Sequence, residues 1–432
     1  MSKSLSDQFA RQLASWLSSA DWHYTTLLSS ALHSIDDAPA DIDEVINHLL
    51  EQYPKKPSQQ KIYRFLKQNT TVRTWFRFSP IKPRVNSYSL VTHGPNQLTH
   101  DKLPVLNCLD DLSSWLNLTA EELIWLCGAW RKTDQDHPKL NHYSYHTIEK
   151  RRGGLRLLES PKTHLKSIQR KIHDKILIYV PVHSSAHGFV IDKGCLSHAT
   201  IHSGKTYLIT FDLEHYFQSV GWFPVYNVFL KLGYIEPVSK ALANLCTHQC
   251  RPDTPEIAKL DATQIQRLKE RHLAQGAPTS PVLSNAVMFH LDHRLTNLAK
   301  SLGMTYSRYA DDLAFSTDKQ RDWRFLEPLV GSICLEEGFT LNYRKSLRRL
   351  AHQRQKLTGI VVNKQPNIDR RYYDQLKAIL TNCIRTGANS QNRSNIPHFE
   401  QHLLGRVLYV EQLNPRKGSK LKQLYEQIDF SR

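Results

Sequence analysis

The stretch RYADDLAFS at residues 308–316 places two adjacent carboxylates between strand-forming residues. This pattern predicts a β-hairpin with Asp311 and Asp312 at its turn. Two like charges side by side raise each other's pKa unless a cation neutralises them, and hard divalent cations favour carboxylate oxygens. The pair therefore indicates a metal site, although taken alone it fits a solvated surface turn equally well.

A third carboxylate, Asp212, follows the apolar segment LITF at residues 208–211. The segment predicts a buried strand that ends at Asp212 and turns into a helix. A carboxylate in that position is either a catalytic group or a helix N-cap. Together, Asp212, Asp311 and Asp312 have enough oxygens to hold two Mg²⁺ ions.

Between these acidic motifs lies QGAPTSP at residues 275–281. Gln275, Gly276 and Pro278 predict a tight turn that opens one long helix over residues 280–302. The backbone amides of the turn and the Gln275 side chain could contact a nucleotide. A loop of this composition before a helix is also ordinary structure, so it has weight only beside the other motifs.

The charge balance points to a polyanionic partner. The 432 residues include 57 Lys and Arg against 40 Asp and Glu, a net charge of +17. A basic protein gains affinity for nucleic acid from each phosphate it neutralises, and an anionic membrane surface is the alternative. Against a membrane, apolar runs such as LIWLCGAW at residues 123–130 are too short to span a bilayer, and no signal-peptide pattern is present.

The seven cysteines are odd in number and scattered, which favours a reduced cytoplasmic protein over a disulfide framework. Cys246, His248 and Cys250 lie together in CTHQC, and His272 follows. A structural zinc site normally needs four ligands at a recognisable spacing. Two close cysteines without a second pair are more typical of a helix end, which is the interpretation we adopt for this segment.

The chain before residue 101 predicts a helical N-terminal extension. Phe9, Leu13, Trp16 and Leu17 would fall on one helix face, and further helical patterns cover residues 41–53 and 61–78. A stretch rich in Pro, Ser, Asn and Gly, residues 79–104, predicts a connection to the main body.

The main body begins with two predicted helices, the second capped by Thr119 and Glu122 in a T-x-x-E pattern. Residues 143–162 predict a hairpin that turns at Gly153–Gly154, and residues 165–180 predict an amphipathic helix. From about Asp369 the chain is again helical and basic.

An apolar strand ending in Asp, then Q-G-A-P-T-S-P before a helix, then Y-A-D-D in a hairpin resembles the reverse transcriptases, from about residue 100 to the end. The resemblance implies an α+β right-hand polymerase fold with fingers, an antiparallel palm and a helical thumb. It implies fingers and palm over 101–367 and a thumb over 368–432, and it leaves residues 1–100 as the helical extension and linker. It further implies an RNA-directed DNA polymerase whose Mg²⁺ ligands are Asp212, Asp311 and Asp312.

The resemblance also implies a nucleotide-binding set. Phe217, five residues after Asp212, would screen out the ribose 2′-hydroxyl of the deoxynucleoside triphosphate, and Gln275 and Gly276 would line the same pocket. Basic side chains would hold the phosphates, although each is also a plausible exposed charge: Arg156, the further candidates Arg151, Arg152 and Lys162, and Lys345 in GFTLNYRKS. LTGIVVN at residues 357–363 resembles a primer-grip hairpin that turns at Gly359.

Within the reverse transcriptases the chain resembles the retron enzymes. His198-Ala199-Thr200-Ile201-His202 matches their N-A-x-x-H segment except at His198, and Leu357-Thr358-Gly359 matches V-T-G except at Leu357. The resemblance implies a structured non-coding RNA as template and His202 as an RNA contact. It implies priming from a guanosine 2′-hydroxyl, a branched RNA–DNA product, and anti-phage defence with a separate effector protein.

Basic residues support an RNA partner independently. LNYRKSLRRLAHQRQK at residues 341–356 contains no acid, so Arg348 and Arg349 could bind RNA phosphates, although a solvated helix face is the alternative. The C-terminal segment interleaves basic and aromatic residues, which suits a thumb that grips an RNA–DNA duplex.

Two other functions fit the same motifs. The chain could be a different bacterial reverse transcriptase, either defence-associated or of the group II intron type, although the length after residue 363 suits a thumb without a maturation domain. It could also be a catalytically silent RNA-binding protein on the same fold. The intact set of three carboxylates argues against that third hypothesis.

Overall fold

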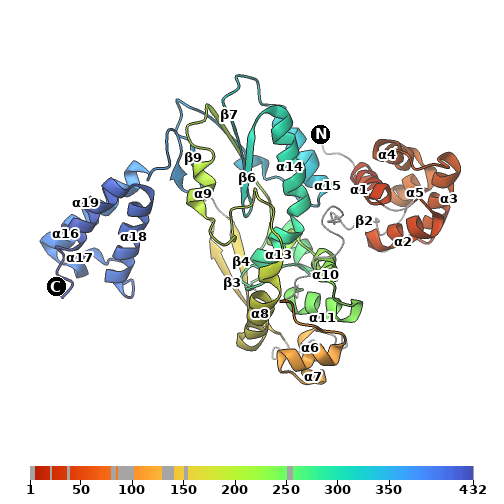
Figure 1. The fold of residues 1–432 in the computed structure, drawn as a ribbon, viewed down its shortest axis with the longest axis horizontal. Coiled ribbons are helices and arrows are strands. Elements are labelled where there is room, and N and C mark those ends of the chain that lie inside the picture. Colours follow the sequence, from red (N-terminus) through yellow and green to blue (C-terminus); the bar gives the residue numbers. More distant parts are fainter. Residues whose placement is uncertain are drawn as a thin grey trace. The chain divides into compact units, whose positions relative to one another are not determined.

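The computed structural model describes residues 5–19, 22–36, 39–78, 84–85, 102–128, 141–149, 154–250 and 256–431. The chain divides into two compact units. The first comprises Met1–His183, Leu213–Leu295 and Trp323–Asn342, and the second comprises Ser184–Asp212, Thr296–Asp322 and Tyr343–Arg432. Figure 1 shows their helices and strands.

The N-terminal part of the first unit is a group of helices, in red and orange in Figure 1. They are α1 (Leu5–Ser19), α2 (Tyr24–Ser34), α3 (Ile42–Gln52), α4 (Gln59–Gln68) and α5 (Thr70–Phe78). Apolar residues recur on one face of each helix, and they form a separate core that includes Phe9, Leu13 and Leu17. The predicted helical extension is confirmed; the Trp16 side chain lies outside the described residues.

The described part of the predicted connection over residues 79–104 includes one strand. Strand β2 (Arg84–Val85) lies within it and pairs antiparallel with β1 (Ile35–Asp36). A two-residue pairing leaves no periodic sequence signal, which is why composition alone indicated only a loop.

The first unit continues with α6 (Leu109–Leu116) and α7 (Ala120–Leu126). The predicted cap of α7 is present: Glu122 N donates to Thr119 Oγ1 at 3.2 Å, and Thr119 N donates to Glu122 Oε2 at 2.9 Å. Strands β3 (Tyr143–Glu149) and β4 (Leu155–Pro161) then form the predicted antiparallel hairpin. Gly153 lies outside the described residues, and Gly154 has a φ of +83° that suits a turn.

The remaining helices from this region are α8 (Thr163–Lys175), α10 (Trp222–Lys231), α11 (Glu236–Cys246), α12 (Ala262–Leu268), α13 (Ser280–Val287), α14 (Phe289–Leu302) and α15 (Leu326–Glu336). The single long helix predicted over residues 280–302 is corrected to two consecutive helices, α13 and α14. Met288 separates them, because its ψ of 0° departs from helical geometry.

The second unit contains a four-stranded antiparallel sheet in the order β6-β7-β5-β8. Its strands are β5 (Tyr207–Asp212), β6 (Thr305–Tyr309), β7 (Asp312–Thr317) and β8 (Leu347–Leu350). Strands β5 and β7 are central and largely buried; the apolar sequence of β5 predicts this burial. Helix α9 (Cys195–Thr200) packs near β6.

The C-terminal part of the second unit is helical, in blue in Figure 1. The short strands β9 (Lys356–Leu357) and β10 (Ile360–Val361) lead to α16 (Arg370–Thr386), α17 (Ala388–Gln391), α18 (Phe399–Leu413) and α19 (Pro415–Tyr425). Thr358 and Gly359 have positive φ values of 46° and 90°, so the predicted turn at Gly359 is confirmed. Apolar residues of α16, α18 and α19 share one core with Leu208 and Ala314 of the sheet.

The α+β class is confirmed, with an antiparallel sheet and helices as expected of a right-hand polymerase fold. Within the part of the chain that the structure describes, no helix has both the length and the apolar character required to cross a membrane.

Candidate active site on the central sheet

Strand pairing gathers the three predicted aspartates at one end of the central sheet. In the register of β5 and β7, Asp212 lies directly opposite Asp312. Asp311 and Ala310 form the turn between β6 and β7, where Ala310 has a φ of 53°. The sequence-predicted carboxylates therefore meet through backbone pairing of segments about one hundred residues apart.

The surroundings of Asp312 favour a cation. Burial is the largest cause that raises its pKa, followed by the negative charges of Asp311 and Asp212, and together they raise the pKa of Asp312 to about 7. A carboxyl group in such a position gains most when a positive charge neutralises the cluster. An all-oxygen set of this kind fits Mg²⁺.

One side chain already supplies a positive charge. Lys345, at the end of the 3₁₀ turn Tyr343–Lys345 that precedes β8, places Nζ 2.8 Å from both Oδ1 and Oδ2 of Asp212. Asp212 is buried, whereas the Lys345 side chain is 44% exposed. The predicted phosphate-binding lysine thus lies within the acidic cluster, on the solvent side.

A backbone segment before β5 supports the acidic turn. Arg308 N donates to Ser185 O and His187 N donates to Arg308 O, both at 2.8 Å. This pairing brings Gly188 so close to the turn that a Cβ on it would lie 2.6 Å from Ala310 N. The buried Arg308 guanidinium also donates to Ala310 O at 3.2 Å. Sequence reasoning missed Gly188 and Arg308, because an edge pairing this short leaves no pattern.

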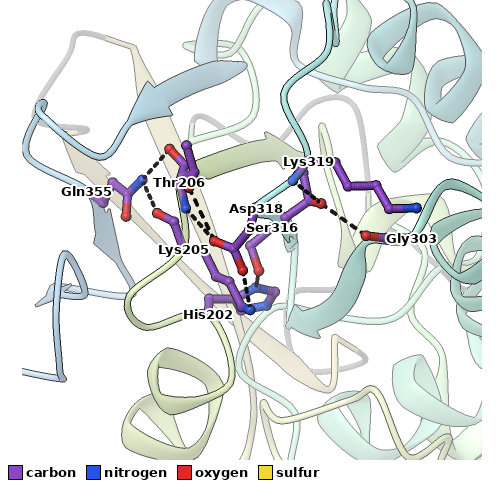
Figure 2. Close-up of polar contacts among 9 residues, drawn as sticks. His202, Lys205, Thr206, Gly303, Ser316, Asp318, Lys319 and Gln355 are labelled. Atoms are coloured by element: carbon purple, nitrogen blue, oxygen red, sulfur yellow. Dashed lines mark hydrogen bonds and ion pairs between the residues drawn. The ribbon is translucent and has the colours of Figure 1, made fainter.

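The structure corrects the expected role of His202. Its Nδ1 lies 2.6 Å from Ser316 Oγ and its Nε2 lies 2.7 Å from Ser307 Oγ, so both ring nitrogens are bonded to the sheet. Figure 2 shows the Ser316 contact. The side chain is fully buried, and burial is the main cause that lowers its pKa to about 3. A neutral, enclosed imidazole anchors the end of α9 on β6 and β7; it has no free group to offer RNA.

His198, the departure from the retron-like pattern, is buried beside His202. Its ring lies 5.9 Å from that of Tyr309, the residue before the acidic turn. Burial lowers the pKa of His198 to about 2, and electrostatic interaction with the neighbouring His202 and His187 acts in the same direction. The segment therefore has a packing role behind the sheet.

Polar contacts tie the other end of the sheet together (Figure 2). Lys205 Nζ donates to Asp318 Oδ2 at 2.7 Å, and Thr206 N donates to Asp318 Oδ1 at 3.0 Å. Gln355 Nε2 donates to Lys205 O at 3.0 Å. These contacts connect the ends of β5 and β7 with the segment after β8, and so stabilise the strand register that positions the aspartates.

Arg348 and Arg349 lie on the edge strand β8, opposite Ile209 and Leu208 of β5. Both arginines are exposed, and Arg348 Nη1 contacts Asp322 Oδ1 at 3.4 Å. The basic segment is thus a 3₁₀ turn and a strand, so the alternative of a solvated helix face does not apply. Its side chains are accessible to a phosphate backbone.

Four predicted nucleotide-binding residues belong to the first unit. Arg156 is exposed on β4 opposite Ile148, and the half-buried Phe217 ring lies 4.9 Å from that of Tyr216. The remaining pair forms the predicted turn: Gln275 O accepts from Glu159 N at 2.9 Å, and Gly276 has a φ of +135°. Of the further candidates, Lys162 is exposed, and Arg151 and Arg152 lie outside the described residues.

Comparison with known proteins agrees with this arrangement. Residues 148–362 match the family described as "Reverse transcriptase (RNA-dependent DNA polymerase)". Retron Mx65 reverse transcriptase of Myxococcus xanthus is 33% identical over 75% of this chain and 73% of its own length. Retron Mx162 reverse transcriptase of the same organism is 33% identical, with 78% and 70% covered. Retron Ec86 reverse transcriptase of Escherichia coli is 28% identical, with 64% and 78% covered.

Proposed function

Because this chain belongs to the retron-type reverse transcriptases and is an RNA-directed DNA polymerase, we propose that Asp212, Asp311 and Asp312 are its catalytic carboxylates. The observation that carries this proposal is the register of β5 and β7, which sets Asp212 opposite Asp312 beside the turn residue Asp311. The raised pKa of Asp312 gives the cluster a physical reason to bind cations.

The three carboxylates would hold two Mg²⁺ ions. Bound there, the ions would supply activation of the primer 3′-hydroxyl and neutralisation of the triphosphate and pyrophosphate charges. Asp212 is held on the rigid end of β5, and Asp311 and Asp312 are held by the turn that Gly188 and Arg308 support. Their positions are therefore set by backbone pairing before any substrate binds.

Lys345 would neutralise negative charge at the same place. Its ammonium reaches both oxygens of Asp212, and nearly half of the side chain is exposed. A flexible lysine in this position is able to exchange the carboxylate for an incoming phosphate. We therefore assign Lys345 to triphosphate binding.

We also propose nucleotide-binding roles for four residues of the first unit. Arg156 would hold phosphate oxygens, which its exposed position on β4 allows. Phe217 would screen out the ribose 2′-hydroxyl, and the Gln275–Gly276 turn would present backbone groups to the nucleotide. A larger residue at Gly276 would be strained by the positive φ, and its Cβ would lie 3.1 Å from Glu159 O.

We further propose which part of the polymerase each segment of the chain forms. Residues 1–100 would be an extension, residues 101–367 fingers and palm, and residues 368–432 a thumb. The exposed Arg348 and Arg349 of β8 and the basic helices after Asp369 would bind the template RNA and the RNA–DNA duplex.

The substrate would be a structured non-coding RNA, copied by priming from one of its 2′-hydroxyl groups into a branched RNA–DNA molecule. The similarity to enzymes named as retron reverse transcriptases supports this proposal. A role in anti-phage defence with a separate effector protein, in the cytoplasm, would follow from the same similarity.

Primer extension tests the catalytic assignment. With Mg²⁺, deoxynucleoside triphosphates and a primed RNA template, Asp311→Asn and Asp312→Asn should each lower the rate by about 1,000-fold or more, because a carboxylate that binds metal contributes several kcal/mol to the transition state. Asp174→Asn, which alters an exposed carboxylate on α8, should retain the wild-type rate. Undiminished extension by Asp311→Asn would contradict the metal assignment.

The nucleic acid that co-purifies with the chain tests the substrate. From cells expressing the protein with its flanking DNA, we expect an RNA-linked DNA whose mobility increases after ribonuclease digestion and which Asp311→Asn does not produce. An unbranched DNA product would favour another bacterial reverse transcriptase. RNA bound equally by both proteins, with no DNA from either, would favour a silent RNA-binding protein.

A further inference from the structure

Three buried ligand-type side chains, none of which has a role in the proposed polymerase chemistry, meet in the first unit. The Cys250 thiol donates to Glu159 Oε1 at 2.9 Å, and His272 Nε2 lies 3.0 Å from the same oxygen. Glu159 is 0%, His272 1% and Cys250 3% exposed. Over the described residues, this is the one group of three histidine, cysteine or acidic side chains whose ligand atoms all lie within 4.8 Å of one another.

The fold brings these residues together from three separate segments. Glu159 lies on β4, and Cys250 follows the end of α11. His272 comes next to Cys250 because His248 and His272 exchange two backbone hydrogen bonds of 2.8 Å. The predicted helix end in CTHQC is correct, since α11 ends at Cys246. The sequence did not reveal Glu159 as a neighbour, because it lies 91 residues before Cys250.

One oxygen of the cluster has no hydrogen-bond partner. Glu159 Oε2 is buried and makes no hydrogen bond. Burial acts to raise the pKa of Glu159, but the charges of His272 and His248 and the bonds from His272 and Cys250 lower it to about 2. An ionised carboxylate oxygen that is buried and unpaired is costly, and a bound cation would remove that cost.

The second nitrogen of His272 is arranged as in metal-binding histidines. His272 Nδ1 lies 2.7 Å from the carbonyl oxygen of Glu270. Since a carbonyl only accepts, Nδ1 keeps its proton, so a cation that displaces the Nε2 proton would meet the lone pair of Nε2. This backbone contact fixes both the tautomer and the orientation of the ring.

A catalytic thiol does not explain the cluster. The Cys250 thiol donates to the carboxylate of Glu159, whose negative charge disfavours the thiolate that a nucleophilic cysteine needs. Burial, followed by the charge of Glu159, raises the pKa of Cys250 far above its usual range. The Cys250 side chain is also buried in an apolar cluster with Leu157 and Leu260.

We propose that Glu159, Cys250 and His272 bind one zinc ion that holds β4 against the segments around residues 250 and 272. A sulfur, a nitrogen and an oxygen ligand together suit Zn²⁺ and are a poor match for Mg²⁺. Binding releases the thiol proton of Cys250 and the second imidazole proton of His272. The two anionic ligands then balance the 2+ charge, and a solvent oxygen completes the tetrahedral coordination.

The zinc would have a structural consequence for the first unit. Glu159 N donates to Gln275 O at 2.9 Å, so the same residue that binds the metal also holds the Gln275–Gly276 turn. Arg156 lies three residues earlier on the same strand. A metal at Glu159 would therefore fix the distance between β4 and the Gln275–Gly276 turn. This structural effect does not require that β4 or the turn contacts a nucleotide.

Metal binding by the purified full-length chain tests the proposal. After dialysis against a chelator, we titrate Zn²⁺ in competition with a chromophoric chelator, and Co²⁺ while recording the ultraviolet thiolate charge-transfer band. Wild type should bind one zinc ion and show the band with Co²⁺. Cys250→Ser should bind zinc at least about 100-fold more weakly and lose the band.

Cys246→Ser is the matched control, because Cys246 is equally buried, lies four residues earlier and is not in the cluster. It should behave as wild type, and so should Asp311→Asn, which alters the acidic cluster on the sheet. If Cys250→Ser does not fold, Glu159→Gln with the same two readouts replaces it. Wild type without a thiolate–cobalt band, or zinc binding unchanged in Cys250→Ser or Glu159→Gln, would overturn the proposal.

Discussion

The residue with the tightest steric requirement near the acidic turn is a glycine. A Cβ at Gly188 would lie 2.6 Å from Ala310 N and 3.2 Å from Tyr309 C, and both contacts are to backbone. Gly188→Ala must therefore displace the turn that carries Asp311. We expect primer extension to fall by about 10- to 100-fold, because small errors in the placement of a catalytic group are costly.

Gly194→Ala is the control for this prediction, since no atom lies within 4 Å of a Cβ built at that position. It should extend primers at the wild-type rate. Circular dichroism separates a displaced turn from general unfolding. A fully active Gly188→Ala would show that the turn tolerates the shift.

At this scale the sequence predicted the acidic residues well and their supports poorly. Asp212, Asp311 and Asp312 stand out because carboxylates at strand ends and turns break an apolar pattern. Gly188 and Glu159 carry no such signal, because their importance depends on a backbone or a side chain from a distant segment. The same limit explains the error at His202, where a motif residue proved to be an internal hydrogen-bonding group.

The edge strand β8 presents basic side chains to solvent. Arg348 and Arg349 lie on it beside Lys345, and both side chains reach solvent. Replacing both arginines with Gln should weaken RNA binding and reduce the slope of log K against log salt by about 1 to 2, because each lost phosphate contact removes about one released counterion.

Lys240→Gln is the control that removes one positive charge from another element, α11, where Lys240 pairs with Glu236. The slope should be measured by filter binding at several salt concentrations. A slope that stays at the wild-type value in the double variant would exclude β8 from the RNA-binding surface.

Elements with strong periodicity or strong turn chemistry were predictable. The capped helix α7, the hairpin of β3 and β4, and the hairpin of β6 and β7 all follow from local sequence. The pairing of β8 with β5 was not, because strands far apart in sequence pair by tertiary contact. The sequence also did not reveal the break at Met288. The apolar periodicity of a helix continues across this residue, whereas the helical backbone geometry is interrupted there.

Over the whole molecule, the sheet of the second unit depends on histidines that must stay neutral. His202 bonds to Ser307 and Ser316 across β6 and β7, and His187 Nδ1 lies 2.8 Å from Ser197 Oγ. Burial is the main cause that lowers their pKa values, to about 3 for His202 and about 4 for His187. The strand arrangement that holds the aspartates is thus coupled to pH.

The sign of this coupling follows from the direction of the shifts. An unfolded histidine has a pKa near 6.5, so below that pH the unfolded state binds a proton that the folded state refuses. The stabilising contribution of each neutral histidine is complete above about pH 6.5 and decreases as the pH falls toward the folded pKa. Each should lose about 2 kcal/mol at pH 5.

The free energy of unfolding of the wild-type chain should therefore fall steeply between pH 7.5 and pH 5.5, as urea denaturation at each pH would measure. His202→Asn cannot titrate, and its amide is able to keep at least one serine contact. The free energy of unfolding of this variant should be lower at pH 7.5. On acidification, its unfolding should take up about one proton fewer than that of wild type, so its free energy of unfolding should depend less steeply on pH. His146→Asn alters an exposed histidine on β3 and should keep the wild-type pH dependence. Equal pH dependence in His202→Asn and wild type would show that the imidazole is protonated without loss of the sheet.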